Sequence, residues 1–300
     1  MKSFKNVIIL FIFSLCIGCN STNEGSIIEE QNGIYSLLYG KLSLSISPEK
    51  GARMISLKQG DKELLSSEAV NNEYYGATLW ISPQSVYWPQ YPNIDQQPYK
   101  TQINGNKLSL TSQTDSINGI LITKEFSISD KDSAIVIKYI ISNISDQPKK
   151  LSPWDVTRVH GGLSFFPVGE ANEMNKSDVT GHYAKDGLVW YSFASPTNEK
   201  GQKLFSTAKG GWLAHYYQGL LFVKCFPDIT PSETPPTQGE VEIYVSPKGE
   251  YLELENHGKY TELKPGENLV YKQKWFVKEA PDKEPNELLA IIENLNKNID

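Results

Sequence analysis

The chain is 300 residues long, with 39% hydrophobic and 21% charged residues, and its formal net charge at pH 7 is −6. This composition is typical of a globular protein and excludes wholesale disorder, and the acidic balance argues against a nucleic-acid-binding protein, which normally carries a basic surface. Three cysteines and four histidines are too few for a disulfide scaffold and leave little material for a metal cluster, so we expect neither a metal site nor a cofactor.

The first 18 residues have the pattern of a bacterial lipoprotein signal peptide. Two lysines precede an apolar run at residues 7–17, which is shorter than the roughly 20 residues that a transmembrane helix needs. Gly18-Cys19 closes this run and resembles the lipobox, in which the cysteine is lipidated and becomes the mature N-terminus. An ordinary signal peptide with an incidental cysteine is the alternative.

The polar segment that follows indicates how the protein is held in the cell. Residues 19–32 are rich in Asn, Ser and Glu and predict a flexible tether, and residues 33–300 are expected to form the folded domain. The predicted location is the bacterial cell envelope, where an N-terminal lipid on Cys19 anchors the protein to a membrane.

Period-two alternation dominates from residue 34 to 277, which predicts an all-β fold. Leu42, Leu44 and Ile46 alternate with serines, and residues 120–128 and 134–141 read as the two strands of a hairpin. One large antiparallel β-sandwich is the simplest architecture. Two smaller sandwiches are the alternative.

The joint between two such sandwiches would fall at residues 144–148. Apart from the strands, one helix is predicted at about 286–297, because Leu288, Ile291, Ile292 and Leu295 follow three- and four-residue spacing.

The first candidate functional segment is an aromatic loop at residues 76–92. It contains Trp80, Gln84 and Trp88. Flat rings stack on the apolar faces of sugars while an amide pairs with hydroxyl groups, so this mixture is typical of a carbohydrate pocket. A loop that only caps the end of the sandwich is an equal alternative.

The second candidate segment is residues 151–167, which contains a strand that is expected to end at His160. Trp154, Arg158 and His160 share one face of such a strand, and Asp155 lies on the other. An arginine beside a histidine is costly in a core but useful over a polyhydroxylated ligand. A solvated edge strand is the alternative.

The third candidate segment holds paired carboxylates at Glu253 and Glu255, which point to the same side of a strand. Two such groups can hold different pKa values and divide acid and base duties. Taken alone, the pair is explained better by the solvated face of a sheet, where alternating glutamates are common.

These segments, in this order, resemble the galactose mutarotase-like superfamily, which includes the aldose 1-epimerases. The resemblance rests on Leu-Trp-Ile-Ser-Pro-Gln-Ser at 79–85, Ser-Pro-Trp-Asp-Val-Thr-Arg at 152–158 and Glu-Leu-Glu-Asn-His-Gly at 253–258. It is closest to an uncharacterised bacterial branch of lipoproteins. The resemblance implies a large antiparallel β-supersandwich with one C-terminal helix.

The resemblance also implies a chemistry. Aldose 1-epimerases use a late glutamate as base and a mid-chain histidine as acid, so Glu255, or its neighbour Glu253, would be the base and His160 the acid. The binding residues implied are Trp80, Gln84, Trp88, Trp154, Asp155 and Arg158. This sequence departs from the epimerase pattern, because the early substrate-binding arginine is missing and His160 is followed by two glycines.

The leading hypothesis is therefore a lipid-anchored carbohydrate-binding protein with an aldose-1-epimerase-like pocket, and the sequence leaves open whether it interconverts sugar anomers. A non-catalytic glycan-binding lipoprotein of a polysaccharide-uptake system is one alternative. A structural module of the envelope with a vestigial pocket is another.

Overall fold

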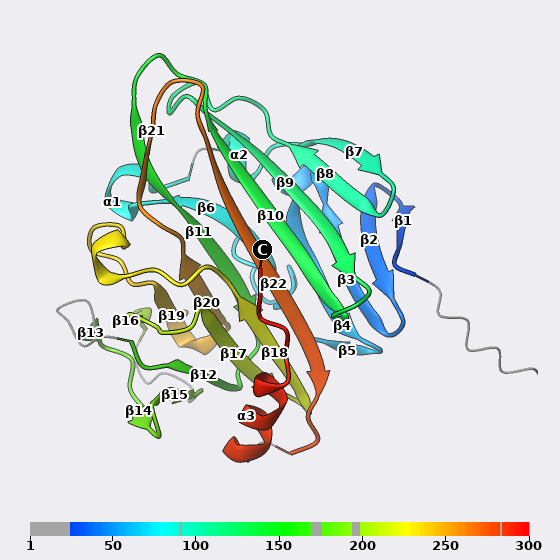
Figure 1. Cartoon of the computed structure of the whole chain (residues 1–300), viewed down its shortest axis with the longest axis vertical. Helices are drawn as coiled ribbons and strands as arrows, with labels where there is room; N and C mark the ends of the chain where they lie inside the picture. The colour runs from blue at the N-terminus through cyan, green and yellow to red at the C-terminus, as the bar shows by residue number, and fades with distance from the viewer. Residues whose placement is uncertain (1–24, 91, 170–175, 194–198, 283, 300) are drawn as a thin grey trace, which may run out of the picture.

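The computed structural model describes residues 25–90, 92–169, 176–193, 199–282 and 284–299. In this part of the chain two large antiparallel sheets make up most of the molecule (Figure 1), and one helix is longer than four residues. The predicted all-β fold class is confirmed.

The first sheet has 12 strands. Its strands run in the order β1-β2-β3-β4-β6-β11-β20-β19-β16-β13, and β5 and β21 pair with β4 and β11 outside this path. The bounds are β1 (Ile27–Gln31), β2 (Ile34–Tyr39), β3 (Leu42–Ser47), β4 (Arg53–Gln59), β5 (Lys62–Glu63), β6 (Ala77–Ser82), β11 (Lys149–Val159), β13 (Lys176–Ser177), β16 (Gln202–Ser206), β19 (Val241–Val245), β20 (Leu252–His257) and β21 (Thr261–Leu263).

The second sheet has 10 strands. They run in the order β14-β15-β12-β17-β18-β22-β10-β9-β8-β7. The bounds are β7 (Lys100–Asn104), β8 (Lys107–Thr111), β9 (Ile120–Ser129), β10 (Ala134–Asn143), β12 (Leu163–Pro167), β14 (His182–Lys185), β15 (Leu188–Ser192), β17 (Trp212–Tyr217), β18 (Leu220–Cys225) and β22 (Asn268–Glu279).

The alternation seen in the sequence is the alternation of buried and outward side chains. Along β9 buried and half-buried residues alternate without a break, and β9 forms the expected hairpin with β10. The main buried cluster contains residues of both sheets, such as Leu44 and Leu254 from the first and Ile137 and Phe222 from the second. Burial of these apolar faces is the main stabilising term of the fold.

Strands from before the possible joint of two smaller sandwiches pair with strands from after it, which argues against two separate sandwiches. Residues 144–148 lie between β10 and β11, yet β11 pairs with the earlier β6, and the late β22 pairs with β10. Both sheets therefore combine strands from before and after this point.

The C-terminal helix α3 (Pro285–Glu293) covers part of the outer face of the 10-stranded sheet. Its buried residues Leu288 and Ile292 belong to a second apolar cluster with Phe165 and Phe276. The helix ends four residues before the predicted limit. Asn294 follows as its C-cap, and the Asn294 side-chain amide donates a hydrogen bond to the Ala290 carbonyl at 2.8 Å.

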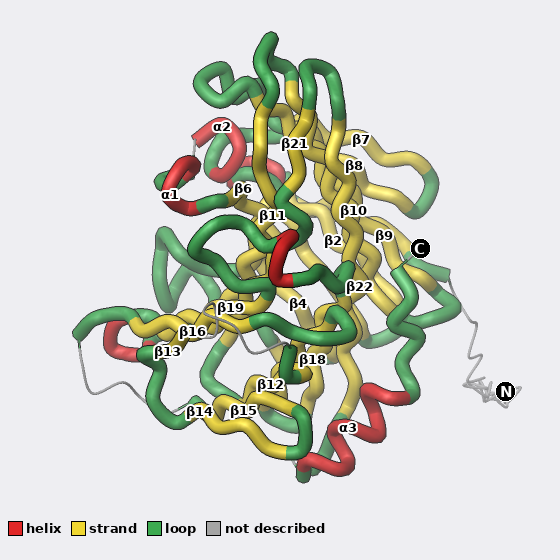
Figure 2. Tube along the Cα trace, turned by 60° about the vertical axis from the view of Figure 1, so that its left-hand side comes forward, coloured by secondary structure: helices red, strands yellow, loops and turns green. Residues whose placement is uncertain are grey.

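The helices α1 (Gln84–Tyr87) and α2 (Pro92–Asp95) are single turns next to β6, far from α3 in Figure 2. The 3₁₀ turns are Pro48–Lys50, Pro231–Glu233 and Pro247–Gly249. Throughout the described ranges, no helix is long and apolar enough to span a bilayer.

The N-terminal segment corrects one prediction. The expected tether at residues 19–32 overlaps β1, which pairs with β2 over its whole length. The sequence concealed this strand because four of its five side chains are exposed, so it shows no apolar alternation. The predicted signal peptide and Cys19 lie outside the described residues.

Candidate functional site

Side chains from four neighbouring strands gather on the outer face of the 12-stranded sheet. The strand register places Arg158 of β11 opposite Glu253 of β20, Glu253 opposite Tyr244 of β19, and Tyr244 opposite Lys203 of β16. Directly opposed residues in a sheet point to the same face. The row therefore brings four polar or aromatic side chains together although they lie up to 95 residues apart in sequence.

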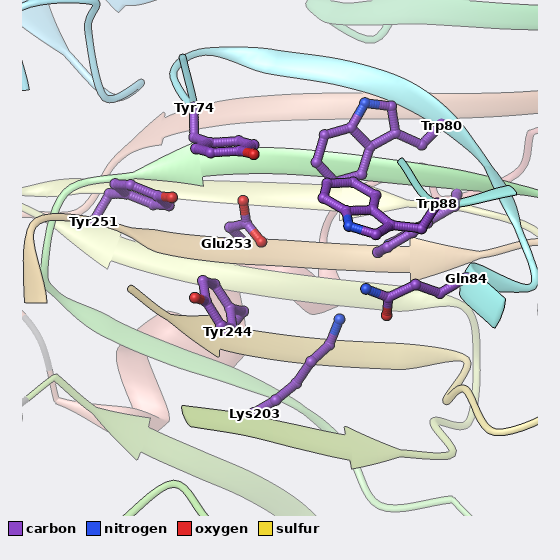
Figure 3. Close-up of a pocket in the computed structure, with 9 residues that line it drawn as sticks. Tyr74, Trp80, Gln84, Trp88, Lys203, Tyr244, Tyr251 and Glu253 are labelled. Atoms are coloured by element: carbon purple, nitrogen blue, oxygen red, sulfur yellow. The ribbon is translucent and has the colours of Figure 1, made fainter. Parts of the chain in front are cut away.

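A pocket of about 260 Å³ lies over this row. Nine residues line it (Figure 3): Tyr74, Trp80, Gln84, Trp88, Trp154, Lys203, Tyr244, Tyr251 and Glu253. Six of these nine are aromatic, and the remaining three carry an amide, an ammonium group and a carboxylate. The volume lies just below the roughly 300–1,000 Å³ of typical ligand pockets, which suits a ligand of the size of one sugar ring.

Three tryptophans form one wall of the pocket. Trp80 contacts Trp88 and Trp154 edge to face, with ring centroids 4.7 and 5.1 Å apart. Such pairs are favourable because the positive edge of one ring meets the negative face of the other. Trp88 follows α1 directly and is 38% exposed, so part of its ring is open to a ligand.

The opposite end of the pocket holds a carboxylate. Figure 3 shows Glu253 between the rings of Tyr74, Tyr244 and Tyr251. Arg158 lies behind it and donates a hydrogen bond from Nε to Glu253 Oε1 at 2.8 Å. This fully buried guanidinium forms an ion pair with the carboxylate of Glu253, whose side chain is only 8% exposed.

Burial dominates the titration of the surrounding phenols. Burial, the neighbouring Glu73 and the charge of Glu253 raise the pKa of Tyr74 to about 12. Burial and the Glu253 charge also raise the pKa values of Tyr244 and Tyr251. At neutral pH these three tyrosines are hydrogen-bond partners and not acids.

A buried ion cluster lies beneath the tryptophan wall. Lys203 Nζ lies 2.6 Å from Glu242 Oε2 and 2.9 Å from Glu255 Oε2, and both glutamates are fully buried. Trp154 Nε1 donates to the same Glu255 oxygen at 2.6 Å. The lysine is the member of the cluster that reaches the pocket, with its side chain 18% exposed.

The two glutamates of this cluster titrate in opposite directions. Burial raises the pKa of Glu255 to about 8, and Lys203 only partly opposes this effect. Burial would also raise the pKa of Glu242, but the charges of Lys203 and His257 hold it at about 2. Burial lowers the pKa of Lys203 less than its two carboxylate partners raise it, so the ammonium keeps its proton.

The same cluster is the one place in the described residues where three metal-ligating groups converge. Ligand atoms of Glu242, Glu255 and His257 lie within 4.8 Å of one another. Lys203 already supplies a cation to both carboxylates at hydrogen-bond distance. We therefore treat this cluster as an internal ion pair that orients the lysine.

Residues 37–278 match the model of a protein family described as a domain of unknown function, DUF4380. The chain belongs to this family. None of the curated proteins matches it.

Solved structures with low sequence identity share the fold of this DUF4380 chain. A candidate aldose 1-epimerase from Klebsiella pneumoniae superposes with a TM-score of 0.60 at 10% identity, over 91% of this chain and 86% of that one. A galactose mutarotase-like protein from Clostridium acetobutylicum has a TM-score of 0.53 at 11% identity, over 85% and 99% of the two chains.

A TPR-domain containing protein from Parabacteroides distasonis has a TM-score of 0.59 at 17% identity, over 83% of this chain and 48% of that one. The DUF4380 chain thus spans about half the length of that protein. At these identities the likeness establishes the galactose mutarotase-like fold and leaves the activity open.

The structure brings most of the predicted binding residues of the DUF4380 chain together. Trp80, Gln84, Trp88 and Trp154 line the pocket, and so does Glu253. Arg158 and Glu255 lie directly behind it, in contact with lining residues.

Two predicted residues lie elsewhere. Asp155 faces the interior between the sheets, where it is fully buried and binds Lys224 Nζ at 2.6 Å and the Tyr139 hydroxyl at 2.8 Å. It contacts no ligand site, so its predicted role in substrate binding is wrong. His160 lies beyond the end of β11 and stacks on Tyr217, 5.5 Å away. It is absent from the pocket and cannot be its acid.

The sequence did not predict four further lining residues, Tyr74, Lys203, Tyr244 and Tyr251, nor Glu242 behind them. The residues of β16 and β19 carry the alternation of ordinary strands. Only the strand order β20-β19-β16 places them beside the paired glutamates. A weak signal existed in Glu242 and Tyr244, which share one face of an otherwise apolar strand.

Proposed function

We propose that the protein is a lipid-anchored carbohydrate-binding protein that holds one sugar unit in the aromatic pocket. The observation that carries this proposal is the pocket itself, where six aromatic side chains surround Gln84, Lys203 and Glu253. Ring faces cover the apolar faces of a sugar, and amide, ammonium and carboxylate groups pair with its hydroxyls and ring oxygen.

The geometry supports binding better than catalysis. Glu255, which the epimerase pattern makes the base, is fully buried, and both Trp154 and Lys203 hold its Oε2. His160, the expected acid, lies outside the pocket. Lys203 and the tyrosines reach the pocket, but their raised pKa values make them poor proton donors near neutral pH.

A second candidate function is aldose-1-epimerase-like isomerisation with Glu253 as base. Glu253 favours this candidate, because its carboxylate is the one that lines the pocket. It would take the proton of the anomeric hydroxyl while an acid protonates the ring oxygen, and the bond between the anomeric carbon and the ring oxygen would break. The acid is the missing partner of this candidate.

Anchoring and sugar binding together fit a glycan-capturing lipoprotein of a polysaccharide-uptake system. The proposed lipid on Cys19 would hold the protein at a membrane of the bacterial envelope, and the folded part would offer the pocket to passing glycans. A structural envelope module with a vestigial pocket would bind no saccharide.

The test is a saccharide-binding screen of the purified protein followed by NMR of anomer exchange. We expect calorimetry to detect binding of at least one monosaccharide, a loss of at least about tenfold in affinity for Trp88→Ala, and no exchange above the spontaneous rate. Val86→Ala is the matched control, since Val86 is exposed on α1 outside the pocket.

Two results would change the conclusion. Absence of any saccharide binding by the wild type would overturn the proposal. Exchange above the spontaneous rate that falls about 10²–10⁴-fold in Glu253→Gln would establish the second candidate instead.

A further inference from the structure

A second cleft, of about 620 Å³, shares no residue with the aromatic pocket. It lies between the start of β12, the β14–β15 hairpin, the turn from β17 to β18 and the beginning of α3. In Figures 1 and 2 these elements lie at the end of the molecule away from α1 and β6. A ligand there would not compete with one in the pocket.

Aromatic side chains form the walls of this cleft. Tyr183, Phe193, Tyr216 and Tyr217 line it, and Tyr183 is 49% exposed. The ring of His160, the residue before the lining Gly161, stacks on Tyr217 at an interplanar angle of 28° and supports that side of the wall. Keeping so large an aromatic surface partly exposed has a solvation cost that a ligand would remove.

Two adjacent glycines let the rings pack against the backbone at the base of the cleft. A Cβ at Gly161 would lie 2.5 Å from the Phe193 ring, and a Cβ at Gly162 would lie 2.4 Å from the Tyr216 carbonyl oxygen. No other residue type fits either position without displacing these neighbours. The pair that departs from the epimerase pattern therefore has a structural role in this cleft.

The polar groups of the cleft indicate the chemistry of its ligand. Ser192, Gln218 and Glu284 lie among the rings, and among the described residues that line the cleft there is no lysine or arginine. A hydroxyl, an amide and a carboxylate pair well with sugar hydroxyls, whereas the Glu284 carboxylate would repel an anionic ligand. The volume exceeds twice that of the pocket, which suits several sugar units.

We propose that this aromatic cleft is a second carbohydrate-binding site, which takes an internal stretch of an uncharged polysaccharide while the pocket takes a single sugar unit. Two sites on one chain raise the effective concentration of a polymer at each of them, so a polymer would be held more tightly than a monosaccharide. The cleft and the pocket share no lining residue. Polysaccharide binding in the cleft therefore does not depend on sugar binding in the pocket.

The test uses affinity electrophoresis of the purified protein in gels that contain soluble β-glucan, galactomannan or xylan. In a Trp88→Ala background, which disables the pocket, we expect retardation by at least one polymer to persist. Adding Tyr183→Ala should weaken that interaction at least about tenfold, whereas Tyr183→Phe should preserve it because the ring remains. Glu284→Gln should weaken it less than Tyr183→Ala.

Controls separate this proposal from loss of the fold and from the pocket. Ile117→Ala is the matched surface change, since Ile117 is 72% exposed and lies outside both sites, and thermal unfolding verifies each variant. Retardation that is unchanged by Tyr183→Ala, or absent in the Trp88→Ala background, would overturn the proposal even if the pocket binds sugars. Binding of a proline-rich peptide at Tyr183, without polysaccharide binding, would overturn it as well.

Discussion

Lys203 is the residue on which the electrostatics of the pocket depend. It compensates the charge of the fully buried Glu242, contacts the equally buried Glu255, and presents its ammonium group to the pocket. Removing one partner of a buried ion pair leaves an uncompensated charge in a medium of low polarity, which typically costs about 3–5 kcal/mol. Lys203→Met should therefore lower the free energy of unfolding by about that amount, measured by urea denaturation at pH 7.

A double variant provides the control for this prediction. Lys203→Met with Glu242→Gln removes both permanent charges, since Glu255 can keep its proton at pH 7. Most of the lost stability should return. If the single variant unfolds at the same urea concentration as the wild type, the lysine is not the compensating group.

Glu255 should make the free energy of unfolding of the protein depend on pH. Its pKa rises from an ordinary 4.5 to about 8 in the folded protein, so between these values the folded state binds more protons than the unfolded state. The free energy of unfolding contributed by this group is therefore present below about pH 4.5 and is lost as the pH rises through 8. Glu255→Gln cannot titrate and should lack this loss.

The measurement is urea denaturation of both proteins at pH 5, 6, 7 and 8. Glu240, whose pKa burial likewise raises to about 8, is present in both proteins, so its contribution cancels in the comparison. Stability should fall with pH more steeply in the wild type. Parallel curves would show that Glu255 is not protonated in the folded state.

At this scale the sequence predicted the aromatic part of the site and little of its ion network. Trp80 and Trp88 were visible because several aromatic residues within one predicted loop need a reason, although Trp80 lies on β6 and is buried. Lys203 was not, because a lysine on a strand normally points to solvent, and its burial depends on strand neighbours that no local pattern reveals. The alternation of side chains along a strand correctly placed Asp155 and Trp154 on opposite faces of the sheet. It could not tell which of the two faces packs against the other sheet.

At the scale of elements, α3 is the helix that the sequence could predict, because its apolar residues repeat with helical spacing. Leu288 is fully buried against the outer face of the 10-stranded sheet. Leu288→Ala should lower the free energy of unfolding by about 2–5 kcal/mol, the usual cost of truncating a buried leucine. Glu287→Ala, one residue earlier and exposed, should change it by less than about 0.5 kcal/mol. Equal effects in thermal unfolding would show that α3 does not pack as described.

Strands were easier to predict than their partners. The alternation in β3 and β9 marks each strand locally, whereas β1 escaped notice because its side chains are exposed and only its backbone pairs with β2. His160 was assigned to the face of Trp154 because the strand was extended one residue too far, beyond Val159.

At the scale of the whole molecule, the sequence predicts a lipid anchor on Cys19, which lies outside the described residues. The short apolar run that ends at Gly18-Cys19 predicts acylation of Cys19, and we expect metabolic labelling with a palmitate analogue to mark the wild type and to leave Cys19→Ala unmarked. Membrane fractionation should release the variant in parallel. Equal labelling of the two proteins would refute the anchor.

The position of β22 in its sheet has a consequence for how the chain is made. This strand ends at Glu279, yet it lies in the middle of the 10-stranded sheet, where it pairs with β18 on one side and β10 on the other. Until β22 leaves the ribosome, the other strands of this sheet form two separate groups, one that ends at β18 and one that ends at β10. Each group has an unpaired edge where β22 will pair. Ribosomes add about 5–20 residues per second, so the nascent chain spends on the order of 15–60 s without a completed sheet. Such a chain is exposed to aggregation during synthesis, but it also remains open enough to be threaded through a membrane before it folds.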